Sequence, residues 1–340
     1  MHEFINRATG EKLRCEFKIA TADTPELLEG LQLCVRDEYG DTYPRSDVYD
    51  LPKLADKVRS GQLIVYLAIN EDGDPVSSLA LSPCGGLSDV PEMTMHVVRR
   101  QYRGFGIGTV LTCELLNLPN VKNYSAVATH AVTFHAMAQH QTLNCGFEPC
   151  GFLFLVHSND VLKHTFDVKG CIKQSFAVAV YPESKQTAGE LFTPKEHQGF
   201  IQKRYDRLGV SYTLSESNAV SDLTVMHTNF DEVHHALTAE IFSGGKDLDA
   251  WADAVLNKPH HPHQTINVLV DMNDPGAVYS YETLKRHGFF FTGVHPLCGN
   301  GEFLILHNPM NLEVPFEKLC IDEGYKEIFT YIRNYSGGKI

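Results

Sequence analysis

The feature that most constrains this chain is a glycine-rich turn at residues 103–108, which read Arg-Gly-Phe-Gly-Ile-Gly. Residues 92–98 before it are typical of a strand, and residues 109–116 after it are typical of a helix. Glycine allows positive φ angles and a close approach of the backbone to a ligand. The first turn of a helix offers N–H groups without partners and the positive end of the helix dipole. The sequence therefore predicts a strand–turn–helix unit that can bind an anion such as a pyrophosphate.

Two common phosphate-binding motifs do not fit this turn. A P-loop requires Lys-Ser or Lys-Thr after its last glycine, and neither pair follows Gly108. A dinucleotide fingerprint requires the spacing GxGxxG, whereas Gly104, Gly106 and Gly108 are spaced GxGxG. A glycine-rich turn before a helix also occurs for purely structural reasons, so the interpretation depends on the surrounding segments.

Length and charge limit the class of protein. The 340 residues predict two domains of ordinary size, and a hydrophobic content of 43% is enough for a core. The 42 acidic residues outnumber the 29 basic ones, which gives a formal net charge of -13. Nucleic acid is therefore not an expected partner, because phosphate binding favours a basic face. The charge weakly favours a cationic or amine substrate, with plain solubility as the alternative explanation.

Cysteine usage and the chain start predict the compartment. The nine cysteines are an odd number, and no C-x-x-C pair occurs, which fits free thiols in a reducing compartment. The N-terminal residues contain no apolar signal-peptide core. The strongest apolar runs, such as residues 152–156, have the length of a strand and are too short to span a bilayer. We expect a soluble cytoplasmic protein without a membrane partner.

Hydrophobic periodicity and turn residues predict an α/β protein with a mixed sheet. Helices are expected over residues 24–34, 54–60, 109–116, 131–144, 194–208, 231–241, 248–256, 277–287 and 317–334. Strands are expected over residues 63–69, 76–81, 92–98, 124–129, 152–156, 175–181, 223–229, 265–271, 289–291 and 303–307.

The two halves of the chain end alike. Polar residues at 158–172 suggest a boundary, and each half closes with a strand, a helix, a Gly-Phe pair and an apolar strand. The Gly-Phe pairs are Gly146-Phe147 and Gly288-Phe289. An internal duplication explains this pattern, although a helix that ends in glycine before a strand is common in itself.

The turn and several other segments resemble a known family. Arg103, Gly106 and Gly108 fill the R-x-x-G-x-G acetyl-CoA signature of the GNAT N-acetyltransferase superfamily. The chain also resembles a bacterial tandem-GNAT subgroup that is often fused to anti-sigma-factor-like kinase domains, although no kinase region is visible here. The segments that carry this second resemblance are residues 39–44, 48–49, 131–135 with Gln139, and 288–293 with Pro296.

The resemblance implies an acyl-CoA N-acyltransferase (GNAT) fold with two similar tandem halves. Residues 1–160 would bind acyl-CoA, and residues 170–340 would form a degenerate GNAT-like domain that lacks a glycine-rich CoA loop. The co-substrate would be acetyl-CoA or another acyl-CoA, its pyrophosphate held by the N–H groups of residues 104–109, with no metal. The implied cofactor-binding residues are Val97, Val98, Arg103, Gly104, Phe105, Gly106, Ile107, Gly108 and Thr109. One departure stands out, because Thr142 occupies the place where many family members have a tyrosine that protonates the thiolate.

Candidate catalytic residues lie next to the turn. Glu92, Thr94 and His96 alternate along the predicted strand and so share a face. An amine must lose a proton before it can attack a thioester, and Glu92 is our first choice as general base, with His96 second. Ordinary roles as a solvated carboxylate and a packed histidine are the alternatives.

The predicted helix over residues 131–144 places His135 and Gln139 one turn apart. His135 would protonate the departing thiolate or orient the substrate, with a structural role equally open. We expect His130 and His140 at the surface.

A polar-aromatic loop is the predicted wall of the acceptor site, through Tyr39, Thr42, Tyr43 and Tyr49, with a packed loop as the alternative. The histidines of residues 260–263 lack a partner at metal-ligand spacing, so no metal is expected. Cys145 and Cys150 are interpreted as ordinary thiols because no Cys-His signature is present.

These observations predict a transferase that moves an acyl group, in the first instance acetyl, from CoA to an amine of a small molecule by direct attack. A non-catalytic acyl-CoA-binding sensor or regulatory module is the first alternative. A protein lysine acetyltransferase is the second, and it would need an open groove. Whether the chain forms a homodimer stays open.

Overall fold

The computed structural model describes residues 1–84, 87–159, 171–183, 186–217, 219–298 and 301–336. Its first half contains a strand pair, two helices and a run of alternating strands and helices. In chain order these elements are β1 (His2–Ile5), β2 (Lys12–Ile19), α1 (Pro25–Tyr39), η1 (Ser46–Tyr49), α2 (Leu51–Arg59), β3 (Ile64–Asn70), β4 (Pro75–Cys84), β5 (Leu87–Val98), η2 (Arg100–Tyr102), α3 (Ile107–Leu116), β6 (Ala126–Val132), α4 (Met137–Asn144), β7 (Glu148–Ser158) and β8 (Lys173–Pro182).

The second half repeats the alternation of strands and helices. Its elements are β9 (Thr187–Phe192), α5 (Gln198–Leu208), β10 (Ser211–Ser215), β11 (Val225–Asp231), β12 (Ala236–Ser243), α6 (Leu248–Asn257), β13 (Thr265–Asp271), α7 (Ala277–Arg286), β14 (Phe290–Cys298), β15 (Gly301–Asn308), η4 (Phe316–Lys318), η5 (Glu323–Tyr325) and α8 (Lys326–Tyr335).

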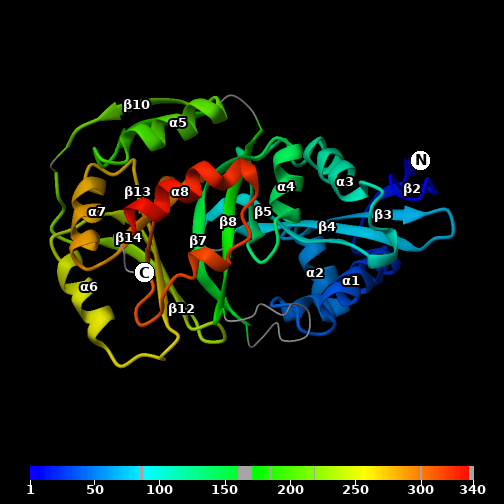
Figure 1. The fold of residues 1–340 in the computed structure, drawn as a ribbon, viewed down its shortest axis with the longest axis horizontal. Coiled ribbons are helices and arrows are strands. Elements are labelled where there is room, and N and C mark those ends of the chain that lie inside the picture. Colours follow the sequence, from blue (N-terminus) through cyan, green and yellow to red (C-terminus); the bar gives the residue numbers. More distant parts are fainter. Residues whose placement is uncertain (85–86, 160–170, 184–185, 218, 299–300, 337–340) are drawn as a thin grey trace.

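A 13-stranded sheet runs through both halves (Figure 1). Its order is β1-β2-β3-β4-β5-β6-β8-β7-β14-β15-β13-β12-β11, and β9 pairs with β10 in a separate sheet of two strands. Helices α1 and α2 lie on one side of β3, β4 and β5, and α3 and α4 lie on the other (Figure 1). The two sides have separate cores, since Leu28 and Leu31 of α1 pack with Val65, whereas Leu111 and Leu115 of α3 pack with Leu79.

The same topology occurs twice. The elements β5-α3-β6-α4-β7-β8 give the strand order 5-6-8-7, and β12-α6-β13-α7-β14-β15 give the equivalent order 12-13-15-14. The units meet where β7 and β14 pair antiparallel at Gly151 and Gly293. The predicted α/β class and the two similar halves are confirmed.

Strand β8 shows how the halves divide. It follows the predicted boundary in sequence but lies between β6 and β7, and it pairs with both along most of its length. The predicted domain limits, 1–160 and 170–340, remain a prediction, and most of the residues between them fall outside the described part of the chain.

Three predicted helices are wrong in part or in whole, and of the helix predicted at 317–334 only residues 326–334 are α-helical. Residues 131 and 132 still belong to β6, so α4 covers only the second half of the helix predicted at 131–144. Residues 236–243 form β12 rather than part of a helix over 231–241, because they pair with β13 across six residues. Non-local pairing overrides the local pattern at β6 and β12. The first two strands and the β9–β10 pair had no predicted counterpart.

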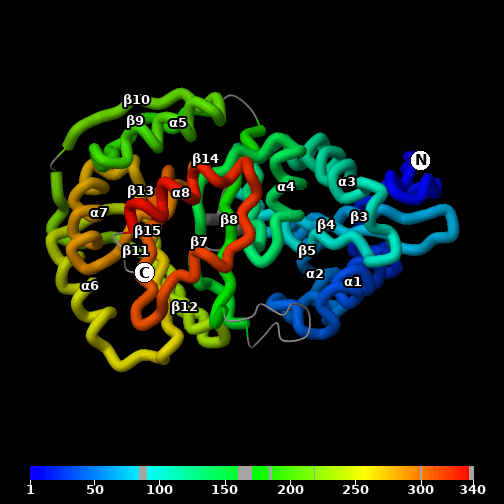
Figure 2. The backbone as a smooth tube through the Cα atoms, in the orientation of Figure 1, coloured from blue at the N-terminus to red at the C-terminus, as the bar shows by residue number. Residues whose placement is uncertain are grey.

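The C-terminal segment returns to the junction of the halves (red in Figure 2). Helix α8 packs against β7 and β14, and η5 contacts α4. Within the described ranges, no helix combines the length and the apolar character that a bilayer crossing requires.

Candidate functional site

The main cleft opens where two parallel strands part. β5 and β6 pair only at Glu92 with Ala128 and at Met93 with Thr129. Directly beyond, Met95 has a positive φ of 49°, which bends β5 away from β6 as a bulge does. The cleft between them has a volume of about 1080 Å³ and extends from the glycine turn to residues of the second half.

Tyr43 from the loop between α1 and α2 fixes this bulge. Its hydroxyl accepts a hydrogen bond from the Met95 N–H at 3.3 Å and lies 3.0 Å from the Thr94 hydroxyl. Burial raises the pKa of Tyr43, and so the phenol stays protonated. The gap between the strands is thus set by a contact from another element.

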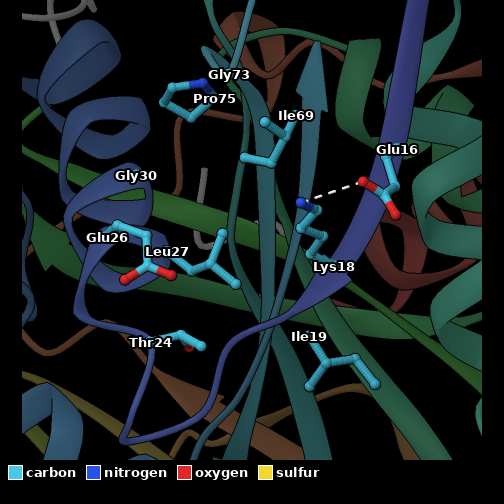
Figure 3. Close-up of a pocket in the computed structure, with 10 residues that line it drawn as sticks. All are labelled: Glu16, Lys18, Ile19, Thr24, Glu26, Leu27, Gly30, Ile69, Gly73 and Pro75. Carbon is cyan, nitrogen blue, oxygen red and sulfur yellow. Dashed lines mark ion pairs between the residues drawn. The ribbon is translucent and has the colours of Figure 1, made fainter. Parts of the chain in front are cut away.

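A second hollow, of about 590 Å³, lies between α1 and the strands β2 and β3 (Figure 3). Glu16 and Lys18, both on β2, form an ion pair of 3.1 Å beside it. None of the predicted site residues lines it, so the chemistry belongs to the main cleft.

The glycine turn presents a run of free backbone donors. Gly104 and Gly106 have φ angles of 87° and 78°, and Gly106 caps α3. The first backbone hydrogen bond at this helix start is from Val110 N–H to Gly106 O at 3.4 Å. Among the described residues, no acceptor bonds the N–H groups of residues 104–109, and most of these residues line the cleft. Such donors at a helix start are suited to a phosphate.

The turn has room for a side chain at Gly106 but not at Gly108. A Cβ atom at Gly106 would meet nothing within 4 Å, whereas one at Gly108 would lie 3.1 Å from Val98 and 3.2 Å from both Gln141 and His96. Gly108 is therefore required for close packing of the helix start against β5 and α4.

Arg103 supports the turn from the side. Its guanidinium pairs with Glu38, and its Nε donates to the carbonyl of Val98 at 3.1 Å. The side chain thus ties α1, the end of β5 and the turn together. Phe105 differs from its neighbours because it is buried in the α3 core and does not line the cleft. Val97, Val98 and Thr109 line the cleft, and their role in cofactor binding stays a prediction.

Glu92 and His130 form a pair at the apex of the cleft. His130 Nδ1 lies 2.9 Å from Glu92 Oε1. Burial alone would raise the pKa of Glu92, but the attraction and the hydrogen bond from His130 outweigh it and hold the pKa below the usual value. Within the described part of the chain, the buried Nε2 of His130 has no hydrogen-bond partner. The expectation that His130 is a surface residue is therefore wrong.

His96 is held in a neutral state beside the turn. Burial lowers its pKa to about 4. The Gln141 amide nitrogen lies 3.1 Å from its Nδ1 and also donates to Thr112 at 3.2 Å. His96 thus lines the cleft as a neutral polar group rather than as a cation.

His135 and Gln139 do not share a helix face. His135 precedes α4 and lines the cleft, and burial lowers its pKa. Gln139 lies on α4 but is buried, where its amide nitrogen donates to the carbonyls of Val132 and Cys320. Gln139 therefore holds the C-terminal segment against α4.

The predicted acceptor loop divides into two parts. Tyr39 and Tyr43 line the cleft. Thr42 and Tyr49 lie off it and hold the loop, since the Thr42 hydroxyl donates to Tyr39 O at 2.7 Å and the Tyr49 hydroxyl donates to Gly40 O at 2.8 Å.

Several cleft residues had no counterpart in the sequence analysis. Arg45 lies near the Glu92 end, and Asp231 and His234 reach the cleft from the second half. The Ser158 N–H donates to His234 Nδ1 at 3.2 Å, which places the proton of this imidazole on Nε2. Only the alternation of β6 could have indicated His130, whereas the residues of the second half gave no local signal.

The second half has a filled counterpart of the glycine turn. Gly244 and Gly245 follow β12 just before α6, but their N–H groups donate to Asp274 at 2.8 Å and to Thr224 at 3.1 Å. β12 and β13 also pair without parting. The expectation that this half lacks a glycine-rich CoA loop stays a prediction, and the Gly244-Gly245 turn that stands here already has partners for both N–H groups.

Position 142 lies against the C-terminal segment. The Thr142 hydroxyl donates to Gln139 O at 2.9 Å and lies 3.4 Å from the hydroxyl of Tyr325. Burial raises the pKa of this phenol, which is packed against Phe152.

Comparisons with known proteins return solved acetyltransferases at low sequence identity. No protein-family model matches the chain, and no curated protein matches it. An N-acetyltransferase from Staphylococcus aureus Mu50 is 16% identical over 50% of this chain and 98% of its own, with a TM-score of 0.38. A spermidine N-acetyltransferase from Vibrio cholerae, solved with CoA and spermine, is 12% identical over 50% and 95%, also with a TM-score of 0.38. Similarity at this level carries no argument about activity or substrate.

Proposed function

We propose that this protein is a CoA-dependent acyltransferase of the GNAT type that moves an acyl group, in the first instance acetyl, to the amine of a small molecule. The observation that carries the proposal is the run of unbonded N–H groups at residues 104–109, which opens into the cleft between β5 and β6. A pyrophosphate supplies the acceptors that these donors lack.

The parted strands extend this site to a thioester. Beyond the pairs at Glu92 and Met93, β5 and β6 leave a gap that begins at the turn and ends at the apex of the cleft. An extended pantetheine arm beside Val97 and Val98 would direct the thioester from the turn to this apex. The positioning of two reactants in such a gap removes several kcal/mol of the barrier to reaction.

The Glu92–His130 pair supplies the base. The acceptor ammonium loses one proton to this pair, its nitrogen attacks the thioester carbon, and the C–S bond breaks. The nitrogen loses a second proton as the amide forms, and the CoA thiolate takes up one proton and leaves as the thiol. An ionised Glu92 that accepts from His130 Nδ1–H leaves the lone pair of Nε2 free for the proton. We assign His96 and His135 to orientation of the thioester. Thr142 receives no role in proton transfer, because its hydroxyl donates to Gln139.

The walls of the cleft favour a small acceptor over a protein. Asp231 and His234 of the second half line the same cleft as the glycine turn. We propose that residues 170–340 form this wall of the acceptor site and leave more room for a small molecule than for a protein. The filled turn at Gly244 and Gly245 supports a single acyl-CoA site in residues 1–160.

The test is release of free CoA thiol from acetyl-CoA with a panel of small amines. Gly106→Trp places a large side chain in the open space before the donors, and it should abolish both CoA binding and thiol release. Gly10→Trp is the matched control, since Gly10 has a φ of 74° and open space around it but lies in the turn between β1 and β2.

Equal turnover by the Gly106→Trp variant and the wild type would refute the site. Tight binding of acetyl-CoA without thiol release for any amine or peptide would instead favour the non-catalytic sensor. Release with lysine peptides alone would favour protein acetylation.

A further inference from the structure

We propose that the acceptor carries a carboxylate next to its amine, as an α-amino acid does, and that Arg45 binds this carboxylate. The inference rests on the proposed function and names its substrate class. It comes from a guanidinium and a carboxylate that lie at the same end of the cleft without pairing to one another.

Arg45 is held in place by a hydroxyl and has no counter-ion among the described residues. It lies in the loop between α1 and α2, is partly buried, and lines the cleft. Its Nη1 donates to the hydroxyl of Ser82 at 2.6 Å. Among the described residues, no carboxylate forms an ion pair with Arg45. Arg36 and Arg103, by contrast, pair with Asp41 and Glu38. A guanidinium fixed by one hydroxyl keeps most of its five donors for a ligand.

Register places Arg45 beside the proposed base. Ser82 of β4 pairs directly with Glu92 of β5, and residues paired in an antiparallel ladder project to the same face with Cβ atoms about 5 Å apart. The guanidinium at Ser82 is thus close enough to Glu92 to help lower the pKa of that carboxyl, after the larger effects of burial and His130. Glu92 pairs with His130 instead, so a positive and a negative group face the cleft side by side.

This pair of charges is the complement of a zwitterion. The ammonium of an α-amino acid approaches Glu92 and His130, where it loses its proton. The carboxylate, two bonds away, meets the planar fork of Arg45, which matches a carboxylate in two parallel hydrogen bonds. A simple alkylamine satisfies only the first of the two groups and leaves the remaining donors of Arg45 without an acceptor as water is displaced. The preference for an amino acid over an alkylamine therefore follows from the charge of Arg45 rather than from the shape of the cleft.

The experiment compares matched pairs of acceptors with acetyl-CoA. Each pair consists of an L-amino acid and the amine that lacks its carboxylate, such as phenylalanine with phenethylamine and lysine with cadaverine. For at least one pair, kcat/KM of the amino acid should exceed that of the amine about tenfold or more, as expected for a charge-assisted hydrogen-bonding pair.

Arg45→Gln tests the residue itself. The KM for the preferred amino acid should rise about tenfold or more, the preference over the amine should fall to near unity, and the KM for acetyl-CoA should stay unchanged. Arg45→Lys should restore part of the preference, because it retains the charge without the fork. Arg14→Gln is the matched control, since Arg14 pairs with Glu3 at the surface of β2.

A binding measurement makes the result independent of turnover. Amino acids should raise the unfolding temperature of the CoA-bound wild type but not of the CoA-bound Arg45→Gln variant. The inference is overturned if kcat/KM for the amines that lack a carboxylate equals that for the matching amino acids. It is also overturned if no amino acid binds. The first of these results leaves the proposed acyltransferase intact. Failure of CoA to bind overturns the proposed function instead.

Discussion

At the scale of single residues, Glu92 owes its chemistry to its neighbours. Burial alone would raise the pKa of this carboxyl, and His130 on the adjacent strand lowers it again. The result is an ionised base within a cleft, in contact with an imidazole whose Nε2 has no hydrogen-bond partner in the described part of the chain. A strand position gives only the direction in which Glu92 projects, whereas its charge state depends on a residue 38 positions away in the chain.

Glu92→Gln should retain the contact with His130 but remove the negative charge. We expect kcat/KM for the acceptor to fall about 100-fold or more, because general base catalysis typically contributes factors of that size. The Kd for CoA should be unchanged, since residues 104–109 are untouched. Steady-state kinetics and calorimetric titration check the two values. Glu29→Gln on the exposed side of α1 is the control, and an equal loss in both variants would contradict the assigned role.

The sequence predicted residues whose role depends on their chain neighbours better than residues whose role depends on distant contacts. The glycine turn was identified correctly because its positive φ angles and free N–H groups are properties of consecutive residues. His130 was assigned to the surface, because its partner depends on the pairing of β5 with β6. Arg45, Asp231 and His234 reach the cleft from a loop and from the other half of the chain, and no spacing in the sequence links them to the turn.

At the scale of elements, the contact between β7 and β14 joins the two repeats. It depends on two facing glycines, since a Cβ atom at Gly151 would lie 2.6 Å from Thr292 O and one at Gly293 would lie 2.3 Å from the Gly151 Cα. The Gly-Phe pairs indicated the repeat from sequence. A helix was predicted at residues 231–241, but residues 236–241 form a strand because they pair with β13 through backbone hydrogen bonds.

Gly151→Ala should therefore destabilise the protein. The added methyl group forces the backbones of β7 and β14 apart, at a cost of about 1–3 kcal/mol or more of unfolding free energy. Urea unfolding measures the change. Gly199→Ala is the matched control, because Gly199 lies in α5 with no atom within 4 Å of the added Cβ, and it should be neutral or stabilising by up to about 1 kcal/mol. A stable Gly151→Ala variant would show that the junction is looser than described.

At the scale of the whole molecule, many histidines are buried in a neutral state. Burial is the main cause that lowers the pKa of His96, His157 and His197 to about 4, and of His295 and His307 to about 3. They are distributed over both halves and the junction. Composition alone showed 17 histidines but could not show which of them lack water, since burial is a property of the folded sheet.

These histidines predict a loss of stability in mild acid. In the unfolded chain each has a pKa of about 6.5, so the unfolded state binds protons that the folded state does not bind until about pH 4 or below. Stability from this source is fully present above pH 6.5 and falls as the pH drops towards 4. Thermal unfolding between pH 7 and pH 4 should show a steep fall in Tm. Histidine NMR signals that all titrate near pH 6.5 would contradict the account.

The central claim is that the N–H groups of residues 104–109 bind a pyrophosphate. Hydrogen–deuterium exchange of peptides from this turn tests it most directly, because these amides have no acceptor among the described residues and should exchange rapidly in the free protein. Saturating CoA should slow their exchange strongly, whereas pantetheine, which lacks the pyrophosphate, should have little effect. Equal exchange at residues 104–109 with and without CoA would contradict the claim.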